Sequence, residues 1–228
     1  TTTSVTVTAP PPPATVIAAD AFSRTLGSGW GGADTGGAWT FNGSASNLSV
    51  GSGTGKIRLP AGSGPWLALA GVSSSSTDLS ASVVLDKVPT GSGEYVSLTG
   101  RRVTTAGDYR AKLRYTSNGA LSLSLQRTTT SGAETAIAGE TIIPGITVAA
   151  GDKVLLRVQV TGTSPTTVRA RTWKSGTSEP GTWQKSVTDA TPGYQVPGGV
   201  GLYLYLSGGA TNAPITAAID DFTAIPAP

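Results

Sequence analysis

Short runs in which apolar and polar side chains alternate recur along the chain from Val16 onward. Period-two alternation puts the apolar side chains on one face of an extended segment, so each run predicts a half-buried β-strand. These runs occupy residues 81–88, 94–103, 109–115, 120–128, 153–162, 167–173, 200–207 and 216–225. No uninterrupted window has the apolar spacing of a helix, so the pattern predicts an all-β protein.

Turn residues separate the predicted strands. The triplet "SNG" at 117–119 lies between two alternating runs, which is a strong hairpin signal, and "PGG" and "GGATNAP" mark further turns. Many short strands joined in this way predict one sandwich of two sheets, or a barrel. The chain has no repeat of the length found in solenoids or propellers, which argues against those architectures.

The alternation also assigns side chains to faces. The core face is predicted to carry Leu121, Leu123, Leu125, Leu156, Val158, Val160, Val168, Ala170, Leu202, Leu204, Leu206, Ala111, Leu113, Tyr109 and Tyr115. Arg110, Lys112 and Arg114 then point outward. So do Arg157, Gln159, Arg169, Arg171, Trp173, Tyr203 and Tyr205. Aromatic rings stack on sugars and Arg pairs with hydroxyls or carboxylates, so we predict that this last group of seven lines one grooved ligand-binding face.

The first fifteen residues differ from the rest. "SVTVTA" predicts a single strand, and the four prolines at 10–13 predict a stiff, extended spacer. We therefore expect residues 1–15 to be the end of a preceding domain plus a linker, and residues 16–228 to be the main domain. A flexible tail, or an added edge strand on the main domain, is the alternative.

Composition excludes several kinds of chemistry. The 228 residues include no His, no Cys and no Met. A Ser-His-Asp triad, a His general base, the usual zinc sites, thiol nucleophiles and disulfides are therefore excluded. The absence of Met, at position 1 as well, indicates a processed chain or a piece of a longer one. No apolar run approaches the length of a membrane helix, so no membrane partner is expected.

Charge is unevenly distributed along the chain. The net charge is +3, yet residues 101–174 hold eleven Lys or Arg against four Asp or Glu. A basic middle could bind an anionic polymer, or it could be an ordinary solvated sheet face. The sequence has no helix-turn-helix, zinc-finger or RNA-binding signature, so no nucleic-acid partner is expected.

The stretch "DAFSRTLGSGWGGADTGGAWT" at 20–40 resembles the opening of laminin-G-like, concanavalin-A-like jelly-roll domains. Such domains occur in secreted bacterial multidomain proteins and in phage tail proteins. "GEYVSLTGRR", "DYRAKLRY" and "GALSLSLQR" are similar to the central strands of this family, and "GGVGLYLYLSGGATNAPITAAIDDFTA" to its closing strands. The resemblance covers residues 16–226 and implies a two-sheet antiparallel jelly-roll sandwich. The leading segment resembles the last strand of a PKD or immunoglobulin-like repeat.

The resemblance implies that the first strand, residues 18–25, lies near the last, residues 217–224. Trp30 and Trp39 would then belong to the scaffold, with an exposed sugar-stacking Trp as the alternative. Several jelly-roll families hold a structural Ca²⁺ where the terminal strands meet, which makes Asp20, Asp220 and Asp221 candidate ligands. The alternative is that Asp20 and Asp221 cap turns or pair with Arg24.

The segment "WKSGTSEPGTW" places Trp173 and Trp183 on either side of a Gly/Pro turn that contains Glu179. These two rings could clamp a sugar chain. The structural alternative, which we favour, is that they pack on each other or close the edge of the sandwich.

Jelly-roll glucanases usually carry their catalytic carboxylates as Glu-x-Asp-x-x-Glu on one strand, and this chain lacks that motif. Its four Glu are far apart, and Glu134 and Glu140 are predicted in or beside a polar loop. We therefore expect no enzyme.

The expectation is instead a non-catalytic carbohydrate-binding module of a secreted or cell-surface protein. Its partners would be a polysaccharide or other glycan, bound on a concave sheet face, and other domains of the same parent chain. The alternatives are a structural or adhesive module of a surface appendage or phage tail and, third, a glycan-active enzyme domain.

Overall fold

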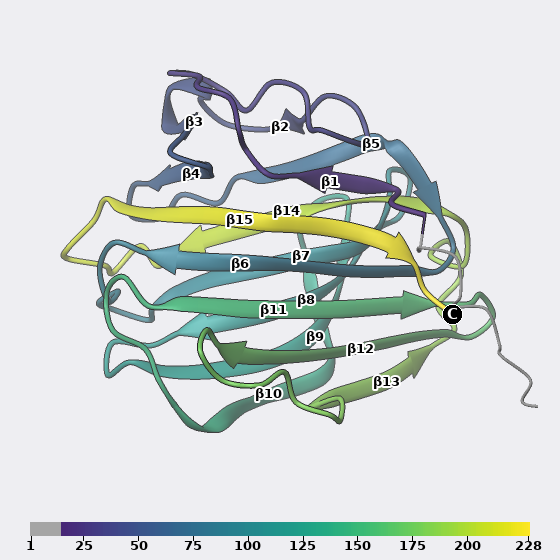
Figure 1. Ribbon diagram of the computed structural model, residues 1–228. Coiled ribbons are helices and arrows are strands. Elements are labelled where there is room, and N and C mark those ends of the chain that lie inside the picture. Colours follow the sequence, from purple (N-terminus) through teal and green to yellow (C-terminus); the bar gives the residue numbers. More distant parts are fainter. Residues whose placement is uncertain (1–14) are drawn as a thin grey trace, which may run out of the picture.

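The computed structural model describes residues 15–228, which form two antiparallel β-sheets packed face to face (Figure 1). One sheet has the order β13 (Lys185–Asp189), β12 (Thr166–Lys174), β11 (Lys153–Thr161), β6 (Thr77–Leu85), β15 (Ile215–Pro226), β4 (Thr54–Leu59) and β3 (Leu48–Gly51), and β1 (Ala18–Asp20) also pairs with β15. The other has the order β10 (Glu134–Thr147), β9 (Ala120–Thr129), β8 (Gly107–Tyr115), β7 (Glu94–Val103), β14 (Gly198–Leu206), β5 (Trp66–Ser74) and β2 (Thr40–Phe41).

This arrangement confirms the predicted jelly-roll sandwich. Within residues 15–228 the helical structure is one 3₁₀ turn, η1 (Ala45–Asn47), so no helix there is long or apolar enough to cross a membrane. The predicted strand and proline spacer of the first fifteen residues lie outside the described part of the chain, apart from Thr15.

Each alternating run of the sequence is a strand, and the hairpin at "SNG" joins β8 to β9. Sequence patterning missed β10, β5 and the short strands β2, β3, β4 and β13. In β10 most side chains are exposed and the pairing with β9 shifts register three times. Period-two alternation cannot mark such an irregular edge strand, which is why Glu134 and Glu140, predicted in or beside a loop, lie in β10 instead.

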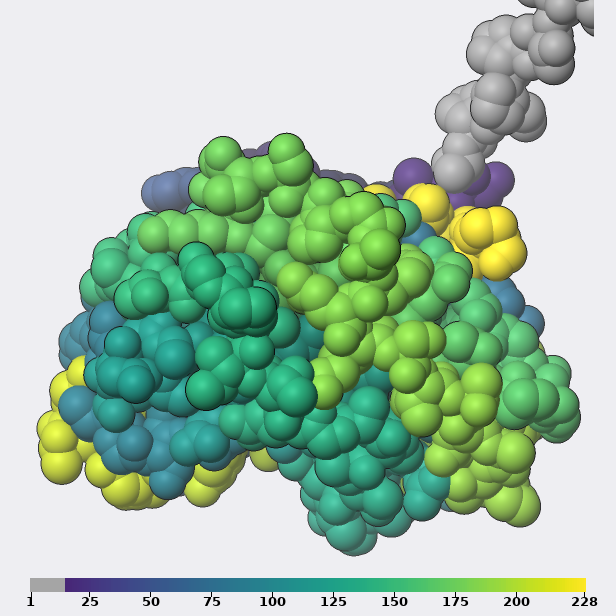
Figure 2. Space-filling view, turned by 90° about the horizontal axis from the view of Figure 1, so that it is seen from below, coloured from purple at the N-terminus to yellow at the C-terminus, as the bar shows by residue number. Residues whose placement is uncertain are grey.

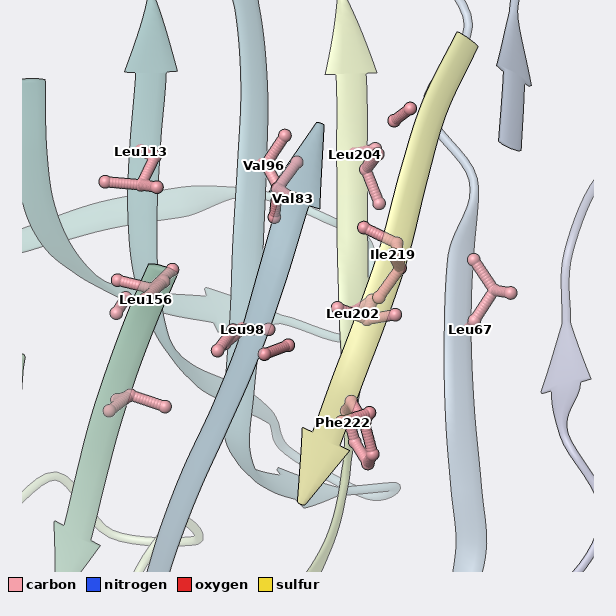
Figure 3. Packing of buried hydrophobic residues seen from close by; sticks show 14 of the residues in the cluster. Leu67, Val83, Val96, Leu98, Leu113, Leu156, Leu202, Leu204, Ile219 and Phe222 are labelled. Atoms are coloured by element: carbon pink, nitrogen blue, oxygen red, sulfur yellow. The ribbon is translucent and has the colours of Figure 1, made fainter. Parts of the chain in front are cut away.

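The core lies between the two sheets. Leu156 of β11, Val83 of β6 and Ile219 of β15 face Leu113, Val96 and Leu204 of the opposite sheet (Figure 3). The side chains that alternation assigned to the core, from Tyr109 through Leu206, are all buried. Burying a Leu, Ile or Val side chain stabilises a fold by about 1.5–3 kcal/mol, so this shared layer holds the two sheets together.

A second part of the core is an aromatic cluster formed by Phe22, Trp30, Trp39 and Phe222. Their ring centroids follow one another at 5.0, 5.1 and 5.0 Å in edge-to-face contacts, and all four side chains are buried. Trp30 and Trp39 are therefore scaffold residues, as predicted. Gly55 of β4 leaves space for these rings, because a Cβ at that position would lie only 2.5 Å from a Phe22 ring atom and 2.8 Å from Trp30 ring atoms.

Asp20, at the end of β1, fixes the segment that carries these rings. Its Oδ1 accepts hydrogen bonds from the Phe22 amide (2.9 Å) and from Arg24 Nη1 (2.8 Å). Its Oδ2 accepts from Arg24 Nη2 (2.8 Å) and from Trp39 Nε1 (2.7 Å). The strand β1 pairs with β15 from Ala18 opposite Ala224 to Asp20 opposite Phe222, so it joins both ends of the domain, as the resemblance implied.

We expect Asp20→Asn to lower the free energy of unfolding by about 3–5 kcal/mol, because breaking a buried ion pair leaves Arg24 without a counter-charge. The amide would also turn one acceptor into a donor that faces N–H groups. Urea unfolding followed by tryptophan fluorescence measures the change. Asp34→Asn is the control, since Asp34 is exposed and an amide oxygen can still accept from the Ala21 amide. Equal losses in the two variants would contradict this role of Asp20.

Glu94, at the start of β7, is a buried carboxyl group whose two oxygens form no hydrogen bond with the described residues. It lies opposite Tyr115 in the β7–β8 ladder, and the hydroxyl of that tyrosine also lacks a partner in this part of the chain. Burial, with a smaller contribution from the charge of Asp86, raises the pKa of Glu94 to about 8. The side chain is therefore protonated in the folded protein at neutral pH.

Stability should consequently fall as pH rises between about 4.5 and 8, because the unfolded chain releases the Glu94 proton in this window while the folded chain keeps it. A difference of this size corresponds to a loss on the order of 4 kcal/mol. Glu94→Gln should abolish it, which urea titrations at several pH values would reveal as a flatter profile. If the profiles of the parent and the variant stay parallel, Glu94 is not the responsible group. Glu140→Gln is the control: it changes an exposed carboxyl group and should leave the pH dependence of the unfolding free energy as in the parent.

Candidate functional site

The outer face of the seven-stranded sheet carries aromatic and charged side chains side by side. In β14 the inward leucines leave Tyr203 and Tyr205 outward, opposite Trp66 of β5 and Tyr95 of β7 respectively. In β8 the same alternation turns Asp108, Arg110, Lys112 and Arg114 outward beside β7. Strand pairing thus collects residues from four strands on one surface.

This surface is hollowed. A cavity of about 480 Å³ lies between Trp66, Arg102 and Tyr203 on one side and the turn at 129–132 on the other. A second cavity, of about 360 Å³, adjoins it at Tyr203 and Gly132. In Figure 2 the outer face of the seven-stranded sheet forms the lower margin of the molecule, and this margin is indented. We call the two cavities together the groove.

Cationic side chains lie on the aromatic rings of the groove. The guanidinium of Arg102 is 4.3 Å from the ring centroid of Trp66, and that of Arg110 is 4.5 Å from that of Tyr203. Lys112 and Arg114 lie over Tyr95 at 5.4 and 5.6 Å. Each contact is a cation–π interaction, and together they hold ring and cation in fixed relative positions.

Asp108 connects the two arginines at one end of the groove. Its carboxylate accepts from Arg102 Nη1 at 3.2–3.3 Å and from Arg110 Nη2 and Nε at 2.7 and 3.1 Å. Asp108 and Arg110 are both buried. One carboxylate therefore pairs with two guanidinium groups at this end, which leaves one positive charge unbalanced.

The other end of the groove is balanced in charge. Lys112 Nζ lies 2.5 Å from Glu134 Oε2, and Arg114 Nη1 lies 3.3 Å from Glu140 Oε1. Both glutamates belong to β10, the strand that the sequence pattern did not reveal.

Tyr203 lies where the two cavities meet. Its hydroxyl forms no hydrogen bond with the described residues, and burial raises its pKa. Gly64 makes room for it, because a Cβ at that position would lie 2.8 Å from the hydroxyl oxygen. The phenol thus remains available to a ligand in the groove.

The predicted single ligand-binding face is wrong in its geometry. Tyr203 and Tyr205 belong to β14, between β7 and β5 of the seven-stranded sheet. The other five residues, Arg157, Gln159, Arg169, Arg171 and Trp173, belong to β11 and β12 of the eight-stranded sheet. Outward side chains of the two sheets point away from each other, because the core lies between them. Alternation assigns a side chain to a face, but it does not assign a strand to a sheet.

The outward side chains of β11 and β12 form hydrogen bonds and ring contacts with other residues of the protein. Arg157 makes two hydrogen bonds of 2.7 Å to Asp78. Gln159 Nε2 donates to the same carboxylate, and Gln159 Oε1 accepts from Arg169 Nε. The guanidiniums of Arg157, Arg169 and Arg171 lie 5.8, 4.8 and 4.4 Å from the ring of Trp183.

The segment 175–184 therefore folds back over this sheet, where it appears light green in Figure 2. No stacking contact joins Trp173 to Trp183 in the described chain. Trp173 instead lines a separate small cavity of about 180 Å³.

The three aspartates proposed as calcium ligands do not share one site. Both oxygens of Asp20 accept N–H groups inside the protein, so its pairing with Arg24, one of the alternatives, is what the structure shows. Asp220 and Asp221 instead lie near Lys153 Nζ, at 3.4 and 3.0 Å. Residues 15–228 contain no cluster of three or more acidic side chains that could hold a metal ion.

Comparison with known proteins identifies the fold. No protein-family profile matches the chain, and no curated protein sequence does. Among solved structures, the chain is similar to a mutant of the GH43 protein BlXynB from Bacillus licheniformis, at 15% identity and a TM-score of 0.55 over 91% of this chain. The chain spans only 39% of the length of that protein.

Two further neighbours match along almost their whole length. A β-1,3-glucanase from Mycobacterium marinum matches 93% of this chain and 100% of its own at 13% identity, with a TM-score of 0.56. A mutant of alginate lyase Aly36B in complex with alginate tetrasaccharide matches 92% and 96% at 10% identity, also with a TM-score of 0.56. The fold is thus the two-sheet jelly-roll sandwich of these neighbours, which are carbohydrate-related proteins.

These neighbours correct the expectation that the chain is no enzyme. That expectation depended on the missing Glu-x-Asp-x-x-Glu motif, whereas the similar structures include a glycoside hydrolase family member, a glucanase and alginate lyases. One fold hosts different chemistries at different sites, so the absence of one family's motif does not exclude catalysis.

The cluster around Trp183 generates a prediction about segment 175–184. Trp183→Ala should expose the three arginines and loosen the segment, which ends beside Lys174 and Lys185, both trypsin sites. Limited trypsin digestion should therefore cut this segment several times faster, while the unfolding free energy falls by about 1–2 kcal/mol. Trp66→Ala, on the opposite sheet, is the control and should leave the cutting rate unchanged. Equal rates in the parent and in Trp183→Ala would contradict this structural role.

Proposed function

We propose that this chain binds a poly- or oligosaccharide along the groove on the outer face of its seven-stranded sheet. The observation that carries the proposal is the row of aromatic rings, Trp66, Tyr203, Tyr205 and Tyr95, beside two adjoining cavities. Aromatic faces pack on the apolar faces of pyranose rings, and the polar groups between them can bind hydroxyls.

The length of the groove supports a chain-like ligand. Two cavities of about 480 and 360 Å³ meet at Tyr203, so one ligand would extend past that ring in both directions. A small compact ligand would leave most of this volume empty.

Rigidity of the lining also supports recognition. Cations lie on the rings of Trp66, Tyr95 and Tyr203, and ion pairs to Asp108, Glu134 and Glu140 hold those cations in turn. A site whose side chains are ordered before binding loses less conformational entropy when the ligand arrives.

The similar structures agree with a sugar ligand. They include an alginate lyase in complex with alginate tetrasaccharide, a β-1,3-glucanase and a legume lectin-like domain from Entamoeba histolytica. We also propose an extracellular or cell-surface location, because polymeric glycans of walls and matrices lie outside cells. Further domains in the parent chain are a second part of the proposal.

Glycan cleavage is the second candidate function, and one observation favours it. The carboxylate of Glu134 and the phenol of Tyr203 line the same cavity, and both are groups that can transfer protons. Mass spectrometry of the oligosaccharides after incubation with the protein distinguishes cleavage from binding alone.

Replacing Tyr203 and Tyr205 together by Ala, or Trp66 alone, should weaken binding of any glycan ligand by at least about tenfold, through loss of stacking area. A glycan array identifies the ligand and calorimetry measures its affinity, which we expect in the micromolar to millimolar range for a groove this open. Circular dichroism checks that each variant is folded.

The matched control is Trp173→Ala, an aromatic truncation on the opposite sheet, which should bind as the parent does. If the double tyrosine variant binds every ligand unchanged, the site lies elsewhere. If the parent binds no glycan across a broad array, the chain acts instead as a structural or adhesive module.

A further inference from the structure

The end of the groove at Asp108 differs from the rest in its charge. Three charged side chains line the larger cavity there: Arg102, Arg110 and Asp108. The other lining residues of this cavity are neutral, and the adjoining cavity pairs Lys112 with Glu134. The larger cavity therefore carries one net positive charge, while the smaller one carries none.

The two arginines also have hydrogen-bond donors to spare. Arg102 donates to Asp108 through Nη1 alone, so its Nε and Nη2 have no hydrogen-bond partner among the described residues. Arg110 uses Nε and Nη2, while its Nη1 lies 3.9 Å from Glu134, beyond hydrogen-bond distance. Donors on two guanidiniums thus remain available to a ligand.

The orientation of the two groups is fixed before any ligand arrives. Each guanidinium lies on an aromatic ring, Arg102 on Trp66 and Arg110 on Tyr203, and Asp108 connects the two. A ring covers one face of each guanidinium, and the N–H donors point outward in the plane of the group. The planar edge of a guanidinium matches a carboxylate through paired N–H···O bonds.

We propose that the glycan recognised in the groove bears uronic-acid carboxylates, and that one such carboxylate binds at Arg102 and Arg110. This inference rests on the proposed function and specifies the class of its ligand. The neutral faces of the sugar rings pack along Tyr203, Tyr205 and Tyr95, and the acid group occupies the end with excess positive charge. Asp108 is a positioning residue that holds both arginines on their rings.

Calorimetric titration of the full chain with an alginate hexasaccharide and an oligogalacturonate hexasaccharide tests the inference. The carboxyl-reduced form of each serves as a neutral ligand with the same linkages. We expect at least one uronate to bind about tenfold or more tightly than its reduced form, and this preference to shrink when salt rises from 50 to 500 mM, because screening weakens only the charge-dependent part.

Arg102→Gln and Arg110→Gln should each remove most of this preference, because each lowers the affinity for the uronate by a larger factor than the affinity for its reduced form. Arg102→Lys keeps the charge and the pairing with Asp108 but loses the planar fork, so it should retain only part of the preference. Arg169→Gln, the same change of charge on the opposite sheet, is the control. Thermal melts verify folding of each variant.

Equal binding of the uronate and its reduced form would overturn the inference while leaving glycan binding intact. Stronger binding of a sulfated oligosaccharide that lacks carboxylates than of either uronate would overturn the choice of carboxylate. Unchanged preference in both glutamine variants would show that Arg102 and Arg110 are not the recognition site. Failure of every oligosaccharide, neutral ones included, would instead refute the proposed function itself.

Discussion

The buried carboxylate of Asp20 is the interaction on which the organisation of the domain depends. It accepts N–H groups from Phe22, Arg24 and Trp39, and its strand pairs with β15 near the C-terminal end of the chain. A Gly-rich segment has little side-chain packing of its own and loses much backbone entropy on ordering. Four N–H···O bonds to one carboxylate offset that cost and hold the aromatic cluster in the core.

Asp108 uses the same chemistry for a different purpose. Like Asp20 it is buried and joins arginine to aromatic rings, but its partners line an open cavity and keep unused donors. A carboxylate whose acceptor positions are filled from within the protein stabilises structure. A carboxylate that balances only one of two neighbouring guanidiniums leaves positive charge for a ligand. This difference assigns Asp20 to the scaffold and Asp108 to the candidate site.

The two outer faces of the sandwich differ for a related reason. On the eight-stranded sheet, Trp183 covers the arginines of β11 and β12, and Asp78 and Glu179 pair with them. On the seven-stranded sheet Arg102 and Arg110 lie on the rings of Trp66 and Tyr203, and these side chains line an open cavity. Similar residue types therefore form a closed structural cluster on one face and a groove on the other.

Local patterning determined most of the strands and the buried leucines, because alternation and turn residues act over a few neighbours. The scaffold role of Trp30 and Trp39 was implied by the family resemblance of residues 20–40 instead. The alternation also predicted correctly that Arg110, Lys112, Tyr203 and Tyr205 point outward. It did not reveal β10, whose bulges interrupt the alternation. It also led to the wrong prediction that β14 shares one face with β11 and β12. Which strand enters which sheet depends on contacts between segments far apart in sequence, and only the tertiary structure supplies those contacts. Those long-range contacts bring Trp66, Arg102, Asp108 and Tyr203 together in the lining of one cavity.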